Sequence, residues 1–166
     1  MNKKENLIID KSSKRHILKE ILNYIKINEF ITTSGQPMIE EFELIKNEKF
    51  EVVINLSVFT SSNAIKNEDE IVTNLGMCYF HIPVDFENPK IEDLKKFINI
   101  LQAFKNNKVW IHCSKNYRVS AFMYVYHKYI LRTPFEKIDI SIFELWSPNH
   151  TWQNLMKISY EELFEL

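Results

Sequence analysis

Cys113 lies where an apolar segment gives way to a polar one, a favourable position for nucleophilic chemistry. The apolar run Val109–His112 ends just before it, and a helical pattern begins near Arg118. Unpaired backbone N–H groups at the start of a helix favour the thiolate form of a cysteine, and they also attract an anion such as phosphate. An arginine a few residues later adds a two-pronged donor for oxyanions. Together these parts predict a cysteine-based phosphoryl-transfer site.

The loop between Cys113 and Arg118 would line an anion site mainly through its backbone N–H groups. Anion-cradling loops often contain glycine, but this loop has none. Asn116 is the expected replacement, because asparagine tolerates positive φ better than most residues. Lys115 either attracts phosphate or is a solvated loop lysine, and Tyr117 either walls the pocket or joins the core. The loop residues are Ser114, Lys115, Asn116 and Tyr117.

Strand and helix patterns alternate along the chain, which predicts an α/β fold with a central, mostly parallel sheet flanked by helices. Strands are expected at about 30–33, 50–58, 77–84 and 109–112. Helices are expected at about 14–27, 38–47, 69–75, 90–104 and 118–131, from Pro134 onward, and at 151–164. Ligands bind at the carboxyl ends of the strands in such sheets. Cys113 and Asp85 both follow an expected strand end, so both are candidates for a site at that edge.

Length and composition restrict the classes of function. The 166 residues favour a single domain, 1–166, with residues 1–28 as an N-terminal helical extension. The net charge of −1 gives no indication of a nucleic-acid or anionic-membrane partner. Two cysteines and the absence of a long apolar run favour a cytoplasmic protein. The histidines show no metal-ligand spacing with the cysteines, so we expect neither a metal nor another cofactor.

Four short motifs occur in an order that resembles the dual-specificity and tyrosine phosphatase superfamily. The resemblance is strongest to a branch of bacterial phosphatase-like proteins described as beta-lactamase-hydrolase-like. It spans roughly residues 30–152, and it implies a cysteine-phosphatase fold. A fifth motif near the carboxyl end also resembles that branch. The motifs are Ser34-Gly-Gln-Pro37, Val52-Val-Ile-Asn-Leu56, His81-Ile-Pro-Val-Asp85 with Pro89, His112-Cys113 with Arg118, and Trp146-Ser-Pro-Asn149 with Trp152.

The spacing between the cysteine and the arginine departs from the family signature. The family has five residues between them, whereas only four separate Cys113 from Arg118. In one interpretation the loop is a residue shorter, and Arg118 still opens the helix facing the anion. In the other, Val119 takes the arginine's place, and Ser120 keeps the family's spacing from the cysteine. One helical residue turns a side chain by about 100°, so the second interpretation would misdirect the guanidinium and puts catalysis in doubt.

The resemblance implies a role for each candidate residue, and each also has a structural interpretation. Cys113 would be the nucleophile that forms a cysteinyl-phosphate, or else a small buried residue. Arg118 would bind phosphate and stabilise the transition state, or else form a surface ion pair. Asp85 would be the general acid, with Glu87 as the fallback, or else it stabilises a turn.

Two further residues would support the nucleophile. His112 would orient the loop, as in the family, or be a satisfied core histidine. Ser120 would hydrogen-bond the thiolate, or bond back within its helix.

Three functions follow from these residues. The first is a cysteine-dependent phosphatase acting on a phosphorylated protein or a small phosphomonoester. The second is a rhodanese-like sulfurtransferase, because the six-residue loop from Cys113 to Arg118 has the length used by that class. The third is a catalytically impaired module that binds a phosphorylated partner.

Overall fold

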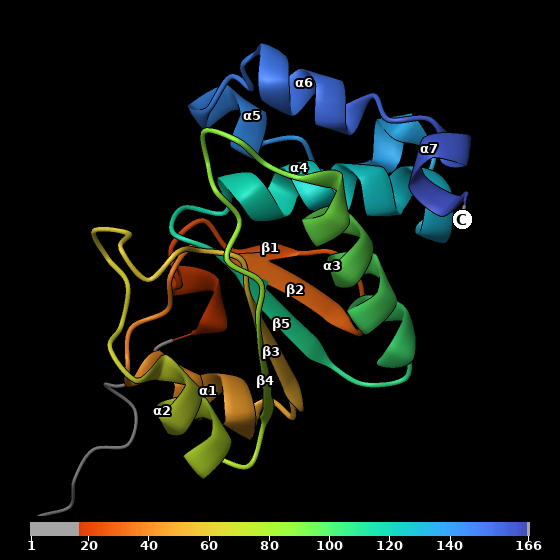
Figure 1. Ribbon diagram of the computed structural model, residues 1–166. Coiled ribbons are helices and arrows are strands. Elements are labelled where there is room, and N and C mark those ends of the chain that lie inside the picture. Colours follow the sequence, from red (N-terminus) through yellow and green to blue (C-terminus); the bar gives the residue numbers. More distant parts are fainter. Residues whose placement is uncertain (1–16, 166) are drawn as a thin grey trace, which may run out of the picture.

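The computed structural model describes residues 17–165, in which β-branched and apolar segments form one five-stranded sheet in the order β1-β2-β5-β3-β4 (Figure 1). Strands β2, β5, β3 and β4 run parallel, and the short β1 is antiparallel to β2. The strands are β1 Ile25–Lys26, β2 Ile31–Ser34, β3 Val52–Asn55, β4 Cys78–His81 and β5 Val109–His112. The expected α/β class with a mostly parallel sheet is confirmed.

The register of the strands aligns their last residues in a row across the carboxyl edge of the sheet. Ser34 pairs with His112, His112 pairs with Asn55, and Asn55 pairs with His81. Cys113 therefore leaves the sheet from a central strand, with Ser34 and Asn55 of its two neighbouring strands at the same edge. The sheet places the Cys113 loop at the edge where α/β proteins bind ligands.

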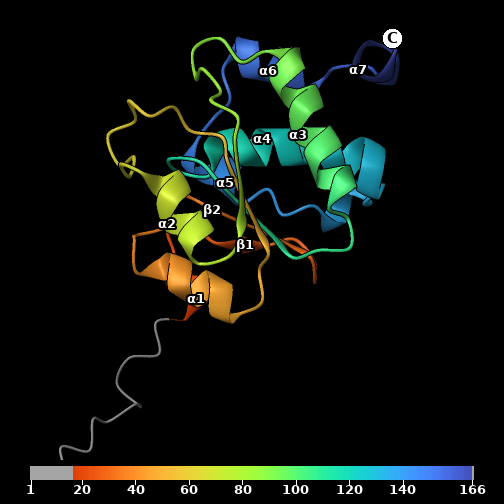
Figure 2. The same cartoon turned by 60° about the horizontal axis from the view of Figure 1, so that its bottom comes forward.

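Helices cover both faces of the sheet (Figures 1 and 2). Helices α3 and α4 and the carboxyl-terminal helices lie on one face, over a core that includes Phe97, Phe122 and Trp152. Helices α1 and α2 lie on the other, around Phe42 and Trp110. The α-helices are α1 Glu41–Asn47, α2 Glu68–Asn74, α3 Ile91–Ala103, α4 Tyr117–Tyr126, α5 Ile142–Leu145, α6 His150–Met156 and α7 Tyr160–Phe164. Shorter helical turns are Leu18–Glu20, His127–Leu131 and Phe135–Lys137.

The expected helix at 14–27 is wrong over the residues that the structure describes, and its start lies outside them. Leu18–Glu20 is a single 3-10 turn, and Ile25–Lys26 is a strand. Asn23 stands between them in the left-handed conformation, with φ 50°, which ends any helix. Pairing of β1 with β2 outweighs the helical pattern of the apolar residues, so the N-terminal helical extension is not supported for residues 18–26.

The carboxyl-terminal helix expected at 151–164 is two helices rather than one. The chain leaves α6 after Met156, and Ser159 starts α7 with a capping box to Glu162. A serine that caps a new helix end competes with a continuous helix for the same backbone N–H groups.

Candidate active site

Cys113 is fully buried at the end of β5, and its backbone N–H donates to the Ser34 carbonyl at 3.4 Å. The chain then turns through residues 114–116 and enters α4 at Tyr117. Within residues 17–165, no backbone N–H from Ser114 to Arg118 has an acceptor in the protein. These amides follow a buried thiol and run into the first turn of the ten-residue helix α4, so they are available to an anion.

The Ser114 and Lys115 carbonyls of the same loop accept hydrogen bonds from distant segments. The Ser114 carbonyl accepts from the Asn63 side chain at 2.9 Å and from the Gln36 N–H at 3.1 Å. The Ser114 hydroxyl donates to Asn63 Oδ1 at 2.7 Å. Asn23 Nδ2 donates to the Lys115 carbonyl at 2.9 Å. These bonds occupy the Ser114 and Lys115 carbonyls, while the loop amides have no acceptor among residues 17–165.

Asn116 makes the turn possible. It adopts φ 67° at the N-cap of α4, the left-handed conformation that its residue type predicted. Its fully buried side chain donates to the Asn23 carbonyl at 2.8 Å and to Thr33 Oγ1 at 3.1 Å. Glycine would permit the same backbone, but it would lose this anchor to the segment before β1.

Gly35 allows the chain after β2 to pass beside this loop. A Cβ atom at this position would lie 2.9 Å from the Ser114 carbonyl oxygen and 2.8 Å from Leu22. The Gly35 N–H also donates to the Leu22 carbonyl at 2.7 Å. The glycine of the Ser34-Gly-Gln-Pro37 motif is therefore required by close packing against the Cys113 loop.

The Arg118 side chain is 7% exposed and lies in the second position of α4. Its Nε donates to the Val84 carbonyl at 2.8 Å, and its guanidinium carbon lies 5.1 Å from the centre of the Phe86 ring. Val119, which the second spacing interpretation puts in the arginine's place, is fully buried in the core. Arg118 thus connects the Cys113 loop to the segment that carries Asp85.

Aromatic rings brace these two segments. Tyr117 stacks on Trp146, with ring centres 5.2 Å apart. Phe86 packs against Trp146 and Trp152, and the Trp152 indole donates to the Phe86 carbonyl at 2.9 Å. Trp146 and Trp152 of the fifth motif therefore pack against the Cys113 loop and the Phe86 segment. Asn149 of the same motif caps α6, the helix that carries Trp152.

A cavity of about 310 Å³, here called the Arg118 pocket, opens over the loop. It brings together four of the expected residues with Phe86 and two serines of the segment after β3. Its lining residues are Ser61, Ser62, Phe86, Ser114, Lys115, Tyr117 and Arg118. Asp85 is exposed and does not line it, and its Oδ1 accepts from the Glu87 N–H at 2.9 Å. Ser120 also lies outside the lining.

The buried histidine before the nucleophile has a partner that the sequence did not indicate. Glu68 is 5% exposed, and its Oε1 lies 2.5 Å from His112 Nε2. Glu68 Oε2 accepts from Asn55 at 3.2 Å and from Gln36 at 3.4 Å. An acidic residue in the first turn of a helix usually faces solvent and complements the helix dipole, so the sequence carried no signal for this inward position. The pair is joined to the nucleophile's backbone, since His112 precedes Cys113 and its Nδ1 lies 3.3 Å from the Cys113 carbonyl.

Within the part of the chain described, no helix is both long enough and apolar enough to cross a membrane. No family model matches the chain, and neither does any curated protein sequence.

Solved structures do match. Tk-PTP shares 16% identity over 87% of this chain and 98% of its own, with a TM-score of 0.68. The catalytic domain of the PP-IP phosphatase SIW14 from S. cerevisiae shares 17% identity over 86% of this chain and 89% of its own, with a TM-score of 0.67. At these identities the likeness shows the cysteine-phosphatase fold alone.

A structure from Shewanella putrefaciens CN-32, named as a candidate phosphatase of the DUF442 family, is more similar. It shares 34% identity over 84% of this chain and 91% of its own, with a TM-score of 0.78. The chain therefore belongs to the DUF442 family of phosphatase-like proteins.

Proposed function

We propose that this protein is a cysteine-dependent phosphatase that hydrolyses a phosphomonoester through a cysteinyl-phosphate intermediate. The observation that carries the proposal is the set of five consecutive backbone amides, Ser114 to Arg118, that have no acceptor among the described residues and follow a buried thiol. A tetrahedral dianion supplies several acceptors for such amides. Arg118 lines the pocket that opens over this loop, whose lining includes Ser114, Lys115 and Tyr117 but not Cys113, and it supplies the positive charge.

The position of Arg118 supports the shorter-loop interpretation of the cysteine-to-arginine spacing. Because α4 begins at Tyr117, Arg118 lies in its first turn and lines the pocket, whereas Val119 points into the core. Its Nε is engaged by Val84, so the terminal nitrogens remain for phosphate oxygens. A two-pronged contact to an oxyanion needs only those two groups.

In the proposed reaction, the Cys113 thiolate attacks phosphorus, and the bond between phosphorus and the ester oxygen breaks. The leaving oxygen takes a proton from an acid, for which Asp85 is the candidate and Glu87 the fallback. Water then attacks the phosphocysteine, losing a proton to the same carboxylate, and the phosphorus–sulfur bond breaks to release phosphate and the thiolate. His112 would position the loop and Ser120 the thiolate, while Ser114, Lys115, Asn116 and Tyr117 would hold the phosphate.

One observation favours the alternative of a phosphate-binding module with impaired turnover. The Asp85 carboxylate is exposed, closes its own turn with Glu87, and does not line the Arg118 pocket. The two functions differ in the need for an acid. A sulfurtransferase gains no support, because the three relatives described above are a DUF442 protein and two phosphatases by name.

Hydrolysis of an aryl phosphate between pH 5 and 8 tests the proposal, with vanadate binding measured in parallel. We expect turnover in the wild type and none in Cys113→Ser, and a loss of about 10²- to 10³-fold in Arg118→Lys, because an ammonium cannot replace a two-pronged oxyanion contact. Asp85→Asn should lower turnover while vanadate binding is retained. Vanadate binding without any turnover in the wild type would establish the binding module instead.

A further inference from the structure

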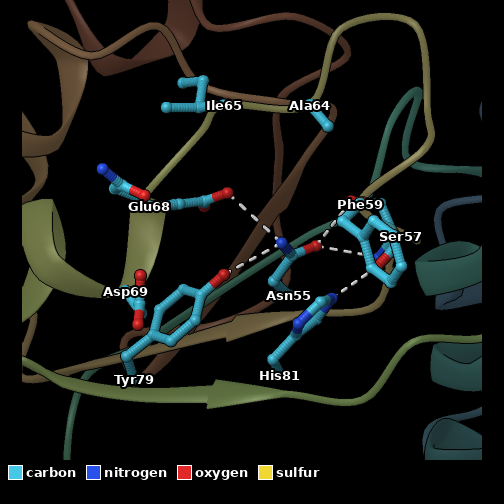
Figure 3. Close-up of a pocket in the computed structure, with 10 residues that line it drawn as sticks. Asn55, Ser57, Phe59, Ala64, Ile65, Glu68, Asp69, Tyr79 and His81 are labelled. Carbon is cyan, nitrogen blue, oxygen red and sulfur yellow. Dashed lines mark hydrogen bonds between the residues drawn. The ribbon is translucent and has the colours of Figure 1, made fainter.

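A second and larger cavity, of about 460 Å³, lies at the same edge of the sheet and is not used by the proposed reaction (Figure 3). It is here called the Tyr79 pocket. Its floor comes from the ends of β3 and β4, and one wall comes from the first turn of α2. Its lining residues are Asn55, Ser57, Phe59, Ala64, Ile65, Asn67, Glu68, Asp69, Tyr79 and His81.

The polar groups of this pocket leave a defined set of unfilled hydrogen-bonding positions. The Tyr79 hydroxyl accepts from Asn55 Nδ2 at 3.0 Å, so its own hydrogen can still be donated. His81 Nε2 lies 2.6 Å from the Ser57 carbonyl, so this nitrogen donates to that oxygen and is not open to a ligand. Among the described residues, the Asp69 carboxylate has no hydrogen-bond or ion-pair partner. Acceptors therefore outnumber donors.

The charge of the pocket is negative. Glu68 and Asp69 line it, and no lysine or arginine of residues 17–165 does. Burial, together with these two carboxylates, raises the pKa of the Tyr79 phenol well above its ordinary value, as expected in a field that opposes a further negative charge. An anionic ligand would meet repulsion here, whereas a cation with N–H donors would fill the open acceptors.

The shape of the pocket favours an organic cation over a metal ion. No group of three His, Cys, Asp or Glu side chains that could hold a metal occurs within residues 17–165. The rim includes Phe59, whose side chain is 82% exposed, beside Ala64 and Ile65. An aromatic face and aliphatic walls suit a planar guanidinium or an alkylammonium with an apolar stem.

We infer that the Tyr79 pocket binds an organic cation bearing a guanidinium or primary ammonium group. The segment 57–67 is the wall between this pocket and the Arg118 pocket. Ser61 and Ser62 line the Arg118 pocket, whereas Ala64 and Ile65 line the Tyr79 pocket. Asn63, between these two pairs, is bonded to Ser114. Glu68 gives a second connection, since it lines the Tyr79 pocket and contacts His112. Glu68 thus links the cation site to His112, the residue before Cys113.

The cation binding can be tested without any turnover. The ¹⁵N-labelled full chain would be titrated with n-butylguanidinium and with N-butylurea, which has nearly the same shape but no charge. We expect butylguanidinium to shift the amide signals of the Tyr79 pocket and to bind at least tenfold more tightly than the urea. Equal binding of the two probes, or no shift in the pocket with either, overturns the inference.

A matched pair of variants tests whether the carboxylate that attracts butylguanidinium belongs to the Tyr79 pocket. Asp69→Asn should weaken butylguanidinium binding at least tenfold, whereas Glu70→Gln, which removes the same charge from an exposed neighbour outside the lining, should change it less than twofold. Both side chains are exposed, so both variants should fold, and their spectra check this. Equal effects of the two variants overturn the inference.

The cation could be a free small molecule or a basic side chain of the phosphorylated substrate. Binding of phosphotyrosine peptides that carry arginine or citrulline beside the phosphorylated residue, measured on Cys113→Ser, distinguishes these sources. A preference for arginine that Asp69→Asn abolishes assigns the cation to the substrate. Equal binding of both peptides, with butylguanidinium still bound, assigns it to a free ligand. This second test alone rests on the proposed function; failure of every phosphopeptide to bind argues against that function and leaves the butylguanidinium result unaffected.

Discussion

Replacement of Glu68 by alanine tests whether its carboxylate holds together a buried polar layer formed with His112, Asn55 and Gln36. The carboxylate is 5% exposed and faces three donors, on His112, Asn55 and Gln36. Alanine leaves all three without this acceptor. A buried donor left without its acceptor costs about 1–3 kcal/mol, so the loss of this shared acceptor should cost about 3–5 kcal/mol in all. Glu68 also lines the Tyr79 pocket, so water can reach the site and keep the loss toward the lower end of this range.

The glutamine variant should cost much less, because its amide oxygen can still accept from Asn55 and Gln36. Its amide nitrogen can donate to the His112 ring if the imidazole proton moves to Nδ1, which lies 3.3 Å from the Cys113 carbonyl. One rearranged hydrogen bond is worth about 0.5–1.5 kcal/mol. The expected order of the loss in unfolding free energy is therefore Glu68→Ala well above Glu68→Gln.

Urea unfolding followed by tryptophan fluorescence measures these losses. With a slope of about 2 kcal/mol/M, Glu68→Ala should move the midpoint down by about 1.5–2 M. Glu70→Ala is the control, since this exposed glutamate lies two positions further along α2 and should change stability by less than about 0.5 kcal/mol. A midpoint for Glu68→Ala within about 0.3 M of the control would refute the assignment of the Glu68 carboxylate as the centre of this layer.

Three further predictions concern the loop, a buried histidine and the aromatic brace. Asn116→Ala should lower the unfolding free energy by about 3 kcal/mol, because alanine disfavours the left-handed conformation and both side-chain hydrogen bonds are lost. Asn116→Gly loses the same hydrogen bonds but tolerates the conformation, so its loss should be about 1 kcal/mol smaller. Equal losses in denaturant titrations would contradict this. Burial lowers the pKa of His127, so the unfolded chain takes up the proton more readily than the folded chain. The contribution of this group to stability is full above about pH 6.5 and falls below it by up to about 1.4 kcal/mol per pH unit. His127→Gln should lose this slope, and parallel curves of stability against pH for the two proteins would contradict the prediction. Trp152→Phe leaves the Phe86 carbonyl without its donor and should cost about 1–3 kcal/mol by thermal unfolding, whereas an unchanged melting temperature would show that this bond contributes nothing.

The sequence predicted the parts of the fold that local chemistry determines. The strand Val109–His112 has the expected bounds, and helix α3 agrees within one residue at each end. Helix α2 agrees with the expected helix at 69–75 within one residue at each end, and Gly76 follows it with φ 81°. Asn116 takes the left-handed conformation expected of it. In each case the signal lies within a few residues of the feature.

The sequence did not predict the parts that depend on contacts between distant segments. The segment before β2 carries a helical pattern, yet it pairs as a strand and sends Asn23 across to the Cys113 loop, 92 residues away. Glu68 meets His112 across 44 residues, and Asn63 meets Ser114 across 51. Polar residues of these types are also common on exposed loops and helix starts, so neither their identity nor their spacing distinguishes them. Only the assembled sheet shows that they hold the site.

The bond from Arg118 to the Val84 carbonyl explains how a short Cys113 loop can still be joined to the acid segment. Val84 immediately precedes Asp85, so the arginine that would bind the anion also holds the backbone from which the candidate acid projects. Lysine at position 118 would keep the charge but has no Nε to donate sideways while its ammonium faces the pocket. Arg118→Lys should therefore weaken vanadate binding and also free the 84–87 segment, visible as faster amide exchange at Glu87. If vanadate binding falls while Glu87 exchange is unchanged, the arginine acts on the anion alone, and the position of Asp85 depends instead on its turn with Glu87 and on the bond from Trp152.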